Sequence, residues 1–348
     1  MQKEDGLATL TDLDAKQALD VKDFSHDAVL LSETVAAVLG VKKLPQENAA
    51  KPEAKKHEGV FVDATFGRGG HSRLLLSQLS ADATLIVFDK DPAAIAVANA
   101  LAATDDRVRV VHNSFATLGQ SLAALNIDKV DGIMADLGVS SPQLDDGSRG
   151  FSFMRDGAVD MRMDTSRGQS VGEWLQVVDE VDLANVLYEF GEERHSRRIA
   201  RAIKQMESFD STLKLAEVIK QAHPNWQKGK HPATQSFQAM RIFINNELGD
   251  VDDFLVQTIN VLKPDANLAV ISFHSLEDRR IKQFFARHSK GQYPEDDLLP
   301  MPPKRPRYFS KPKRVGASHT ELANNPRARS AWLRFAARTD EPYQAGII

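Results

Sequence analysis

The chain has 348 residues, a formal net charge of −4 and no cysteine. Its length and its 42% apolar and 26% charged residues are typical of a water-soluble globular protein with one large or two ordinary domains. The composition excludes disulfides, thiolate metal ligands, a cysteine nucleophile and a polycation, so we predict no bound metal and only a local nucleic-acid patch.

The N-terminal segment, residues 1–23, alternates charged and small residues, and we predict a poorly ordered tail there. It lacks the apolar block of a signal peptide, and no run of the chain approaches the length of a membrane span. We therefore predict a cytoplasmic protein without a membrane partner. His26–Gly40 has helical apolar spacing, and Gln46–Glu58 has the composition of a solvated loop.

From Val60 onward, short apolar runs alternate with helical patterns. Strands are predicted at Val60–Val62, Thr84–Phe88, Val108–Val111, Val130–Ala135 and Leu268–Phe273, with Ala331–Ala336 as an edge strand. Helices are predicted at Ser72–Leu79, Ala93–Ala103, Thr117–Leu125, Val251–Leu262 and Leu276–His288. Strands that alternate with helices predict an α/β fold with a parallel, doubly wound, Rossmann-like sheet.

The α/β pattern is interrupted over residues 144–250. A long polar loop, Leu144–Asp164, is followed only by helical periodicity, at Trp174–Glu189, Glu192–Gln205, Leu213–Ala222 and Thr234–Leu248. We predict an inserted all-helical domain that recognises the substrate. It would divide one α/β domain into residues 24–143 and 251–348, the second part carrying a basic loop at 301–316.

The most informative stretch is GVFVDATFGRGGH, residues 59–71, a strand that runs into a turn containing Gly67, Gly69 and Gly70. Glycine allows positive φ and close approach of a ligand, so a strand, such a turn and a helix predict a nucleotide-type cofactor site. Asp63 would repel a pyrophosphate but attract an ammonium group. Asp89 ends the next strand, where an acid accepts hydrogen bonds from a ribose. The two acids favour S-adenosylmethionine over NAD.

Two further strands end in candidate site residues. Phe115 follows the third strand and could lie against an adenine ring. Asp136 ends the fourth strand and could accept hydrogen bonds from a substrate amine. A tight turn is predicted a few residues later, and it would direct the backbone carbonyl groups of Ser140, Ser141 and Pro142 toward that substrate. His274 ends the fifth strand; a structural role in the turn is the favoured interpretation, with general-base catalysis as the alternative.

Two basic segments are candidates for RNA contact. Arg194, Arg198 and Arg201 are predicted on one helical face, which is either a solvated charged surface or a phosphate-binding one. The segment 304–314, KRPRYFSKPKR, has six basic residues with aromatics among them, which suits single-stranded nucleic acid. We predict RNA contacts there from Lys304, Arg305, Arg307 and Tyr308.

Seven stretches occur in order over about residues 26–340: HDAVLLSE, DATFGRGGHS, DLGVSSPQLDDGSRGFSFMRDGAVDMRMD, GEERHSRRIARAI, HPATQSFQAMRIFINNEL, ISFHSLEDR and NPRARSAWLR. They resemble the RsmH (MraW) family of ribosomal RNA small-subunit methyltransferases. The resemblance implies a class I methyltransferase domain with a helical insertion. It implies transfer of a methyl group from S-adenosylmethionine to the N4 amine of a cytidine in the decoding region, in free ribosomal RNA or the assembled small subunit. It also implies cofactor contacts at Gly69, Gly70, His71, Asp89, Phe115, Asp136 and Gln143.

The chain departs from the family pattern in its longer tail, in Gln46–Glu58, in KPDA at 263–266 instead of KPGG, and in the Lys-Pro segment after Tyr308. Without a cysteine, methyl transfer is expected to be direct and in line. An NAD-dependent oxidoreductase is an alternative, disfavoured by Asp63 and by the lack of G-x-G-x-x-G spacing. A non-catalytic RNA-binding assembly factor that retains the fold is the other alternative.

Overall fold

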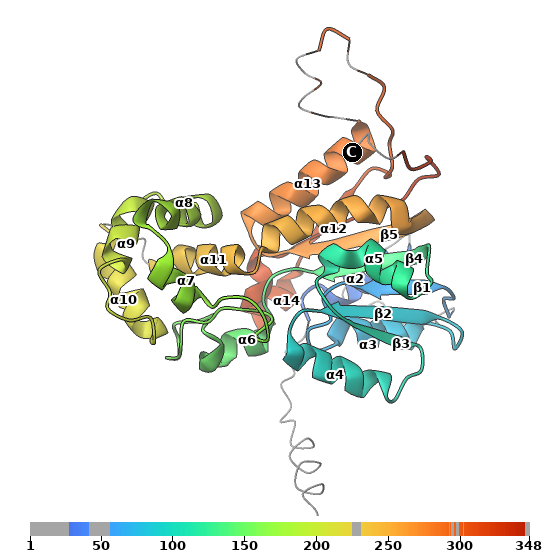
Figure 1. The fold of residues 1–348 in the computed structure, drawn as a ribbon. Helices are drawn as coiled ribbons and strands as arrows, with labels where there is room; N and C mark the ends of the chain where they lie inside the picture. The colour runs from blue at the N-terminus through green and yellow to red at the C-terminus, as the bar shows by residue number, and fades with distance from the viewer. Residues whose placement is uncertain are drawn as a thin grey trace, which may run out of the picture.

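The structure is a computed structural model that describes residues 28–41, 56–224, 231–291, 293, 296, 299–301 and 303–344. The predicted tail, residues 1–23, and nearly all of the predicted loop Gln46–Glu58 lie outside these ranges. An α/β unit and a separate group of helices lie side by side, as Figure 1 shows.

One seven-stranded sheet, in the order β3-β2-β1-β4-β5-β7-β6, forms the centre of the α/β unit. Strands β1 to β5 are parallel, and β7 and β6 are antiparallel to their neighbours. The order reverses between β1 and β4, the point where doubly wound sheets bind ligands. The predicted doubly wound α/β fold is confirmed. The strands are β1 (Val60–Asp63), β2 (Thr84–Asp89), β3 (Val108–His112), β4 (Val130–Asp136), β5 (Leu262–Ser272), β6 (Lys313–Gly316) and β7 (Trp332–Ala337).

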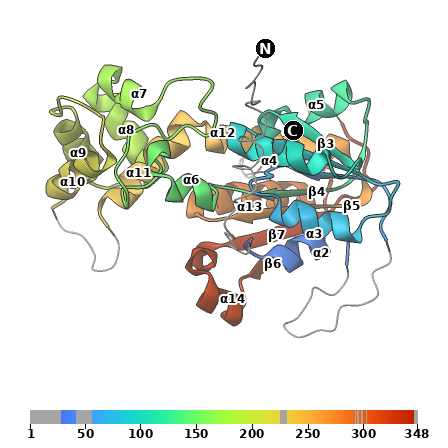
Figure 2. The same ribbon diagram turned by 90° about the horizontal axis from the view of Figure 1, so that it is seen from below.

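Helices cover both faces of this sheet (Figures 1 and 2). Apolar side chains of α2 (Leu31–Val38), α3 (Gly70–Gln78) and α4 (Pro92–Ala102) pack on one face. Those of α5 (Leu118–Ala124), α12 (Glu247–Val261) and α13 (Ser275–Lys290) pack on the other. Strands β1, β2 and β4 and the second half of β5 are therefore buried on both sides, which explains their nearly continuous apolar sequences. None of the helices in the described ranges is long and apolar enough to cross a membrane.

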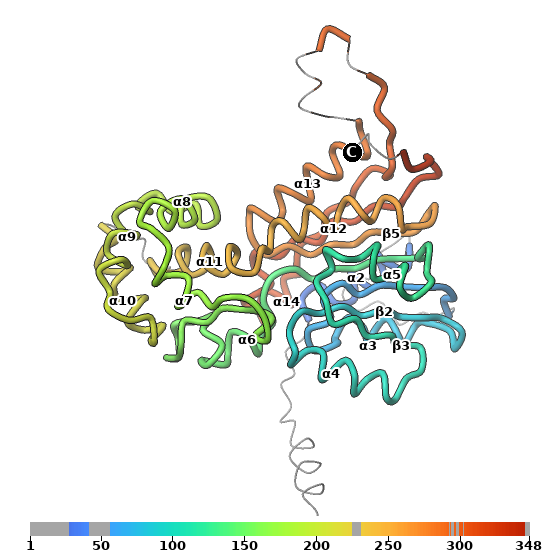
Figure 3. Tube along the Cα trace, in the orientation of Figure 1, coloured from blue at the N-terminus to red at the C-terminus, as the bar shows by residue number. Residues whose placement is uncertain are grey.

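A second group of helices forms what we call the helical lobe, residues 171–224 and 231–244, with its own apolar core. Its helices are α7 (Val171–Val177), α8 (Glu180–Gly191), α9 (Ser196–Ile203), α10 (Thr212–Ala222) and α11 (Ala233–Ile244). The chain leaves the sheet after β4, passes through α6 (Ser141–Asp145), enters the lobe and returns along α11 into α12, as the tube in Figure 3 traces. The predicted division of the chain at residues 144 and 250 stays a prediction.

Two of the predicted lobe helices are each interrupted. Trp174–Glu189 was expected to be one helix, but α7 ends and Asp179 caps a new helix, α8, by accepting a hydrogen bond from Asp182 N–H. In Thr234–Leu248, Asn246 has a left-handed φ of 51° and separates α11 from α12. Both breaks lie at short polar side chains, which compete with the helix for backbone hydrogen bonds.

The C-terminal part of the sheet also differs from the prediction. The apolar segment near 331–336 is not an edge strand, because β7 lies between β5 and β6. The edge is β6, inside the segment predicted as a basic loop, with α14 (His319–Asn324) beside it (Figure 2). Strand β5 begins at Leu262, earlier than predicted, and Asp265 within KPDA takes a φ of 66°.

Candidate functional site

The glycine turn between β1 and α3 has the backbone shape that the sequence predicted. Gly67 and Gly69 have φ values of 55° and 79°, which favour glycine. A Cβ on Gly69 would lie 2.7 Å from the Phe66 ring, whereas a Cβ on Gly67 would meet nothing within 4 Å. Gly70 is exposed and begins α3. The turn therefore packs tightly beneath Gly69 and leaves its backbone open at Gly67.

The Asp89 carboxylate connects this turn to the end of β2. It is half-buried, and its two oxygens accept hydrogen bonds from Gly67 N–H (2.8 Å) and Asp91 N–H (2.9 Å). Burial raises the pKa of Asp89 above its ordinary value. Each carboxylate oxygen keeps a second lone pair, so the group can still accept hydrogen bonds from a ligand hydroxyl.

Asp89→Ala is expected to weaken binding of S-adenosylmethionine by about tenfold or more, because a charged acceptor for hydroxyl groups is lost. Isothermal titration calorimetry measures this affinity. Asp105→Ala is a matched control. That carboxylate pairs with Arg107 at 2.6 Å and lies just before β3, at the amino-terminal ends of the strands and away from the candidate site. Equal affinity in folded Asp89→Ala and wild-type protein would remove Asp89 from the cofactor site.

Asp63 lies beneath the turn rather than on the surface of the site. Its side chain is 1% exposed and accepts hydrogen bonds from Thr65 N–H (3.1 Å) and Ser72 Oγ–H (2.6 Å). Burial is the largest cause that raises the pKa of Asp63 from 3.8 to about 6. The carboxylate thus holds the turn against the first residues of α3. Its contact with a ligand ammonium group stays a prediction.

Asp63→Asn is expected to make stability less dependent on pH. The folded-state pKa is raised, so this carboxyl group stabilises the fold at low pH, and the contribution is lost as the pH rises through about 6. The free energy of unfolding of Asp63→Asn minus that of wild type should therefore grow by roughly 3 kcal/mol from about pH 4 to about pH 8. Urea unfolding across this range measures the difference, and a constant difference would contradict the assignment. For Asp105→Asn, which removes a carboxylate whose pKa Arg107 lowers, the difference should change in the opposite direction and mostly below about pH 4, so it should stay nearly constant between about pH 5 and pH 8.

Asp136 ends β4 beside β1, at the reversal point of the sheet. Its backbone N–H donates to Thr65 Oγ (2.6 Å), and its Oδ2 lies 3.7 Å from His71 Nδ1. Its buried Oδ1 has no hydrogen-bond partner among the residues described. Burial, followed by the charges of Asp63 and Glu277, raises the pKa of Asp136 well above its ordinary value. Buried polar atoms are rarely unpaired, so Oδ1 marks a place for a ligand.

A cofactor contact at His71 was implied by the resemblance to the family and not by the pattern of residues around it. Its Nε2 lies 3.2 Å from the Val29 carbonyl oxygen, and its other nitrogen faces Asp136. Burial lowers the pKa of His71 to about 4, so the ring is neutral at neutral pH. The neutral imidazole donates through Nε2 to the Val29 carbonyl oxygen, so its Nδ1 lies beside Asp136 without a proton to donate and without adding a positive charge to the site.

The residues after Asp136 form a short helix, α6, and the prediction of a tight turn is wrong. Ser140 caps α6, and its backbone N–H donates to Gln143 Oε1 (2.8 Å). The carbonyl groups of Ser140 and Pro142 accept hydrogen bonds from Leu144 and Asp146 within this helix. The Ser141 hydroxyl is hydrogen-bonded to Arg327. The backbone here is thus largely occupied by its own helix, and Asp136 remains the stronger candidate acceptor.

A buried network missed by the sequence analysis lies behind α6 and includes Gln143. Asp91 caps α4, and its Oδ2 accepts hydrogen bonds from Gln143 Nε2 (2.8 Å) and Arg149 Nη1 (2.8 Å). The other guanidinium nitrogen of Arg149 reaches the carbonyls of Arg162 and Met163. Asp-Pro at 91–92 predicts the start of a helix, but it does not predict that Asp91 will bind Gln143 and Arg149, which lie more than fifty residues later in the chain. The network fixes the loop that leads into the helical lobe.

Phe115 lies beyond β3 in a short 3₁₀ helix, Phe115–Thr117. Its half-buried ring meets Phe254 of α12 edge to face, with centroids 5.2 Å apart. The ring thus packs on the core on one side and keeps some exposed surface at the edge where the strands end. That position fits contact with an adenine ring.

The open glycine turn, the Asp89 acceptor and the unpartnered oxygen of Asp136 come from neighbouring strands, at the ends where doubly wound sheets bind ligands. Together they fit a ligand with hydroxyl and amine groups, as S-adenosylmethionine has.

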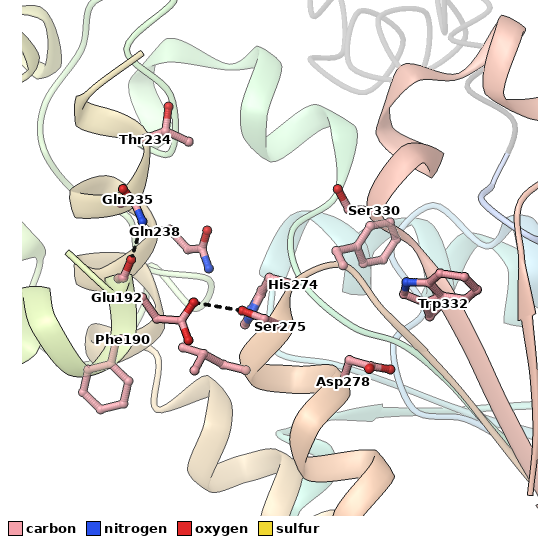
Figure 4. Close-up of a pocket in the computed structure, with 13 residues that line it drawn as sticks. Phe190, Glu192, Thr234, Gln235, Gln238, His274, Ser275, Asp278, Ser330 and Trp332 are labelled. Atoms are coloured by element: carbon pink, nitrogen blue, oxygen red, sulfur yellow. Dashed lines mark hydrogen bonds between the residues drawn. The ribbon is translucent and has the colours of Figure 1, made fainter. Parts of the chain in front are cut away.

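A cleft of about 620 Å³ adjoins this edge, between the helical lobe and the corner that joins β5 to α13 (Figure 4). His274 lies in it, with Nε2 3.1 Å from Glu277 Oε1. Glu247, His274 and Glu277 are close enough to share a metal ion, within 4.8 Å of one another. Arg241, however, donates two 2.8 Å hydrogen bonds to Glu247, and its positive charge disfavours another cation there.

The predicted arginine face is only partly formed. Arg194 precedes α9 and does not share a helical face with Arg198 and Arg201. All three are exposed, and Arg201 lies 3.3 Å from Glu180. Arg194 and Arg198 make no ion pair with any residue in the described ranges. These two charges are therefore free to meet an anionic partner.

The C-terminal basic segment also differs from the prediction. The Tyr308 ring is fully buried, against His288 and Arg338, so it offers no face for the predicted RNA contact. Arg305 pairs with Asp296 at 2.6 Å, whereas Lys304 and Arg307 are exposed. The aromatic residue anchors this segment, and RNA contact by Lys304 and Arg307 stays a prediction.

Comparison with known proteins gives a consistent result. The family model described as MraW methylase family matches residues 23–339. The chain is 76% identical to the ribosomal RNA small subunit methyltransferase H of Psychrobacter cryohalolentis, over 94% of this chain and 96% of the relative. It is 53% identical to the protein of that name from Acinetobacter baumannii, over 91% and 99%.

Among solved structures, an rRNA methylase from Streptococcus thermophilus matches 83% of this chain and 91% of its own, with a TM-score of 0.36 and 9% identity. The implied class I methyltransferase fold is confirmed by the α/β sheet and the match to the family. Because the family model spans most of the chain and the relatives match over nearly their whole lengths, the chain belongs to the MraW methylase family.

Proposed function

We propose that the protein transfers a methyl group from S-adenosylmethionine to the exocyclic N4 amine of a cytidine in the decoding region of small-subunit ribosomal RNA. The observation that carries the proposal is Asp136, a strand-end acceptor with an unpartnered oxygen beside the glycine turn, in a chain of a methylase family. The relatives' names support ribosomal RNA of the small subunit as the substrate. Family membership removes the dehydrogenase alternative.

The cofactor would bind where β1, β2 and β4 end. Asp89 would accept hydrogen bonds from its ribose, Phe115 would lie against its adenine, and the open backbone at Gly67 would admit it closely. Gln143, fixed by Asp91, would hold α6 against the same edge. S-adenosylmethionine supplies a methyl group activated by its bond to a sulfonium sulfur.

Asp136 would act on the nucleophile. The lone pair of a cytosine amine is delocalised into the ring, so the amine needs an acceptor at its hydrogens to become nucleophilic. The Asp136 carboxylate would supply this acceptor. The hydrogen bond from its backbone N–H to Thr65 Oγ would keep the end of β4 in place, the neutral His71 ring lies beside it, and Ser140 to Pro142 follow a few residues on. Holding reacting atoms about 3–3.5 Å apart can lower a barrier by about 7–11 kcal/mol. The proton is then lost to solvent.

The substrate would be a flipped-out base, because the N4 amine of a paired and stacked cytosine cannot reach a site at the sheet edge. Free ribosomal RNA and the assembled small subunit both offer such a nucleotide, and either would place the enzyme in the cytoplasm. The helical lobe would bind the RNA around it.

Mass spectrometry of small-subunit RNA nucleosides, from cells with and without this gene, tests the proposal. N4-methylated cytidine should decrease in the deleted strain and return with the wild-type gene. Return with a folded but inactive variant, or no loss at all, would instead favour the non-catalytic assembly factor.

Replacing Arg194 and Arg198 with Ala, alone or with Arg201, is expected to weaken RNA binding and leave cofactor affinity unchanged. Each lost phosphate contact should reduce the slope of log affinity against log salt by about 0.7 to 0.9. The double variant Lys214→Ala/Lys220→Ala is a matched control, because these exposed lobe lysines already pair with Asp210 and Glu217. Salt-dependent binding assays measure both, and unchanged slopes would identify a merely solvated face.

A further inference from the structure

The cleft between the helical lobe and the sheet has no part in the cofactor site, yet both halves of the molecule line it (Figure 4). Its volume of about 620 Å³ is in the range of sites for small organic groups. The lobe contributes the end of α8 and one side of α11. The core contributes the β5–α13 corner and the start of β7. Its lining includes Glu192, Gln235, Gln238, His274, Ser275 and Trp332.

The core wall of the cleft adjoins Asp136. Strands β4 and β5 are neighbours, and the N–H that follows Asp136, of Leu137, donates to the Ile271 carbonyl oxygen (3.1 Å). Phe273, at the start of the corner, lies over Gly138, where a Cβ would be 3.6 Å from its ring. Glu277, beside His274, is close enough to raise the pKa of Asp136. A group in the cleft can therefore extend to the proposed methyl-accepting position.

Two polar side chains from opposite walls enter the cleft without good partners. Gln238 on α11 points into it, and its half-buried amide makes no hydrogen bond with any residue that the structure describes (Figure 4). Opposite, the His274 side chain caps the start of α13 beside Glu277, and among the residues described its ring nitrogens have no partner other than Glu277. By contrast, Gln235 donates to the Gly191 carbonyl oxygen (3.1 Å) and Ser275 to Glu192 (3.2 Å). Gln238 and His274 are thus the groups that a ligand would satisfy.

An aromatic side chain lines the same cleft. Trp332 begins β7, opposite Ser272 at the end of β5, and is 37% exposed. The Arg314 guanidinium lies 4.0 Å from the centre of its ring system, which fixes the indole in place. A partly exposed indole held in this way suits stacking with a nucleic-acid base.

We propose that this cleft holds the base of the acceptor nucleotide, with Gln238 and His274 hydrogen-bonded to its Watson–Crick edge and Trp332 against its ring. A cytosine edge presents one amine donor and two acceptors, N3 and O2. The Gln238 amide offers both donors and an acceptor, and a neutral imidazole offers one of each. The inference rests on the proposed function and makes the helical lobe part of the base pocket.

Single-turnover methylation of small subunits at saturating cofactor tests the two polar groups. Gln238→Ala should raise the KM for subunits or slow transfer by about tenfold, because polar groups of the base lose their partner. The affinity for S-adenosylmethionine and the thermal melt should stay unchanged. Gln176→Ala removes an exposed glutamine of the same lobe on α7, outside the cleft, and should behave as wild type. A Gln238→Ala enzyme with wild-type KM and rate would overturn the pocket.

Trp332 gives a second, independent readout. Trp332→Ala should raise the KM for subunits by about tenfold, and Trp332→Phe, which keeps an aromatic ring, should restore most of the loss. RNA should also quench part of the indole emission of wild type, and this quenching should be absent from Trp332→Phe, which keeps the other two tryptophans of the chain. Equal KM values for the Ala and Phe variants, without quenching, would overturn the stacking. A wild-type enzyme that does not methylate small-subunit RNA would overturn the proposed function, whereas normal methylation by all the cleft variants would overturn this inference alone.

Discussion

Asp136→Asn is expected to slow single-turnover methyl transfer by about 10²- to 10³-fold, the usual loss when one aligned electrostatic contact is removed from a catalytic site. The substitution preserves shape, but it removes a charge and places an amide donor where the amine needs an acceptor. The backbone bond from Asp136 N–H to Thr65 is unaffected by the change, so the end of β4 should stay in place.

The measurement is transfer at saturating cofactor, with calorimetric affinity and a thermal melt as checks on binding and folding. Asp145→Asn is a suitable control, because Asp145 ends α6 close by in the chain and pairs with Arg327 instead of facing the strand ends. A folded Asp136→Asn enzyme with a near wild-type rate would remove Asp136 from the mechanism and return attention to the residues of α6.

The second large effect is expected on stability, from the buried ion pair of Arg241 and Glu247. Arg241 binds Glu247 through two 2.8 Å hydrogen bonds, at the junction between α11 and α12. Although burial alone would raise the pKa of Glu277, His274 and Arg241 hold it below its ordinary value. Removing the guanidinium leaves buried negative charges uncompensated, so Arg241→Met should lower the free energy of unfolding by about 3–5 kcal/mol.

Urea unfolding at neutral pH measures this loss. The double variant Arg241→Met/Glu247→Leu should lose much less than the single variant, because it removes both charges of the pair. Arg279→Met breaks the exposed pair with Glu192 and should cost no more than about 1 kcal/mol. If Arg241→Met and Arg279→Met were equally mild, the buried pair would not stabilise the junction.

The sheet and the strand-end acids were predictable because their signals are local. Each strand is a short apolar run, and parallel strands bring their carboxyl ends to one edge whatever their order. Asp63, Asp89 and Asp136 follow three such runs, so the sequence placed them together before any distance was known. The sequence did not show that the Asp63 side chain is buried beneath the glycine turn, because its position depends on the hydrogen bond from Ser72 in the next helix.

The errors arise where distant partners decide the structure. Nothing in KRPRYFSK shows that Tyr308 will be buried, since its neighbours His288 and Arg338 lie twenty and thirty positions away in the chain. The same is true of Asp91, whose partner Arg149 is 58 residues on. No local sequence pattern predicts the cleft, because Gln238 and Trp332 come to line it only through the packing of the lobe on the core.

The position of β7 between β5 and β6 has a consequence for synthesis of the chain. Trp332, the first residue of β7, lies 60 residues after Ser272 at the end of β5, so β5 is synthesised well before its partner. Until β7 pairs with it, β5 presents a long apolar strand with an unpaired edge. Such an edge promotes association with other chains. A nascent or truncated chain that ends before Trp332 is therefore prone to aggregation, and the protein can complete the sheet described here only after β7 has been synthesised.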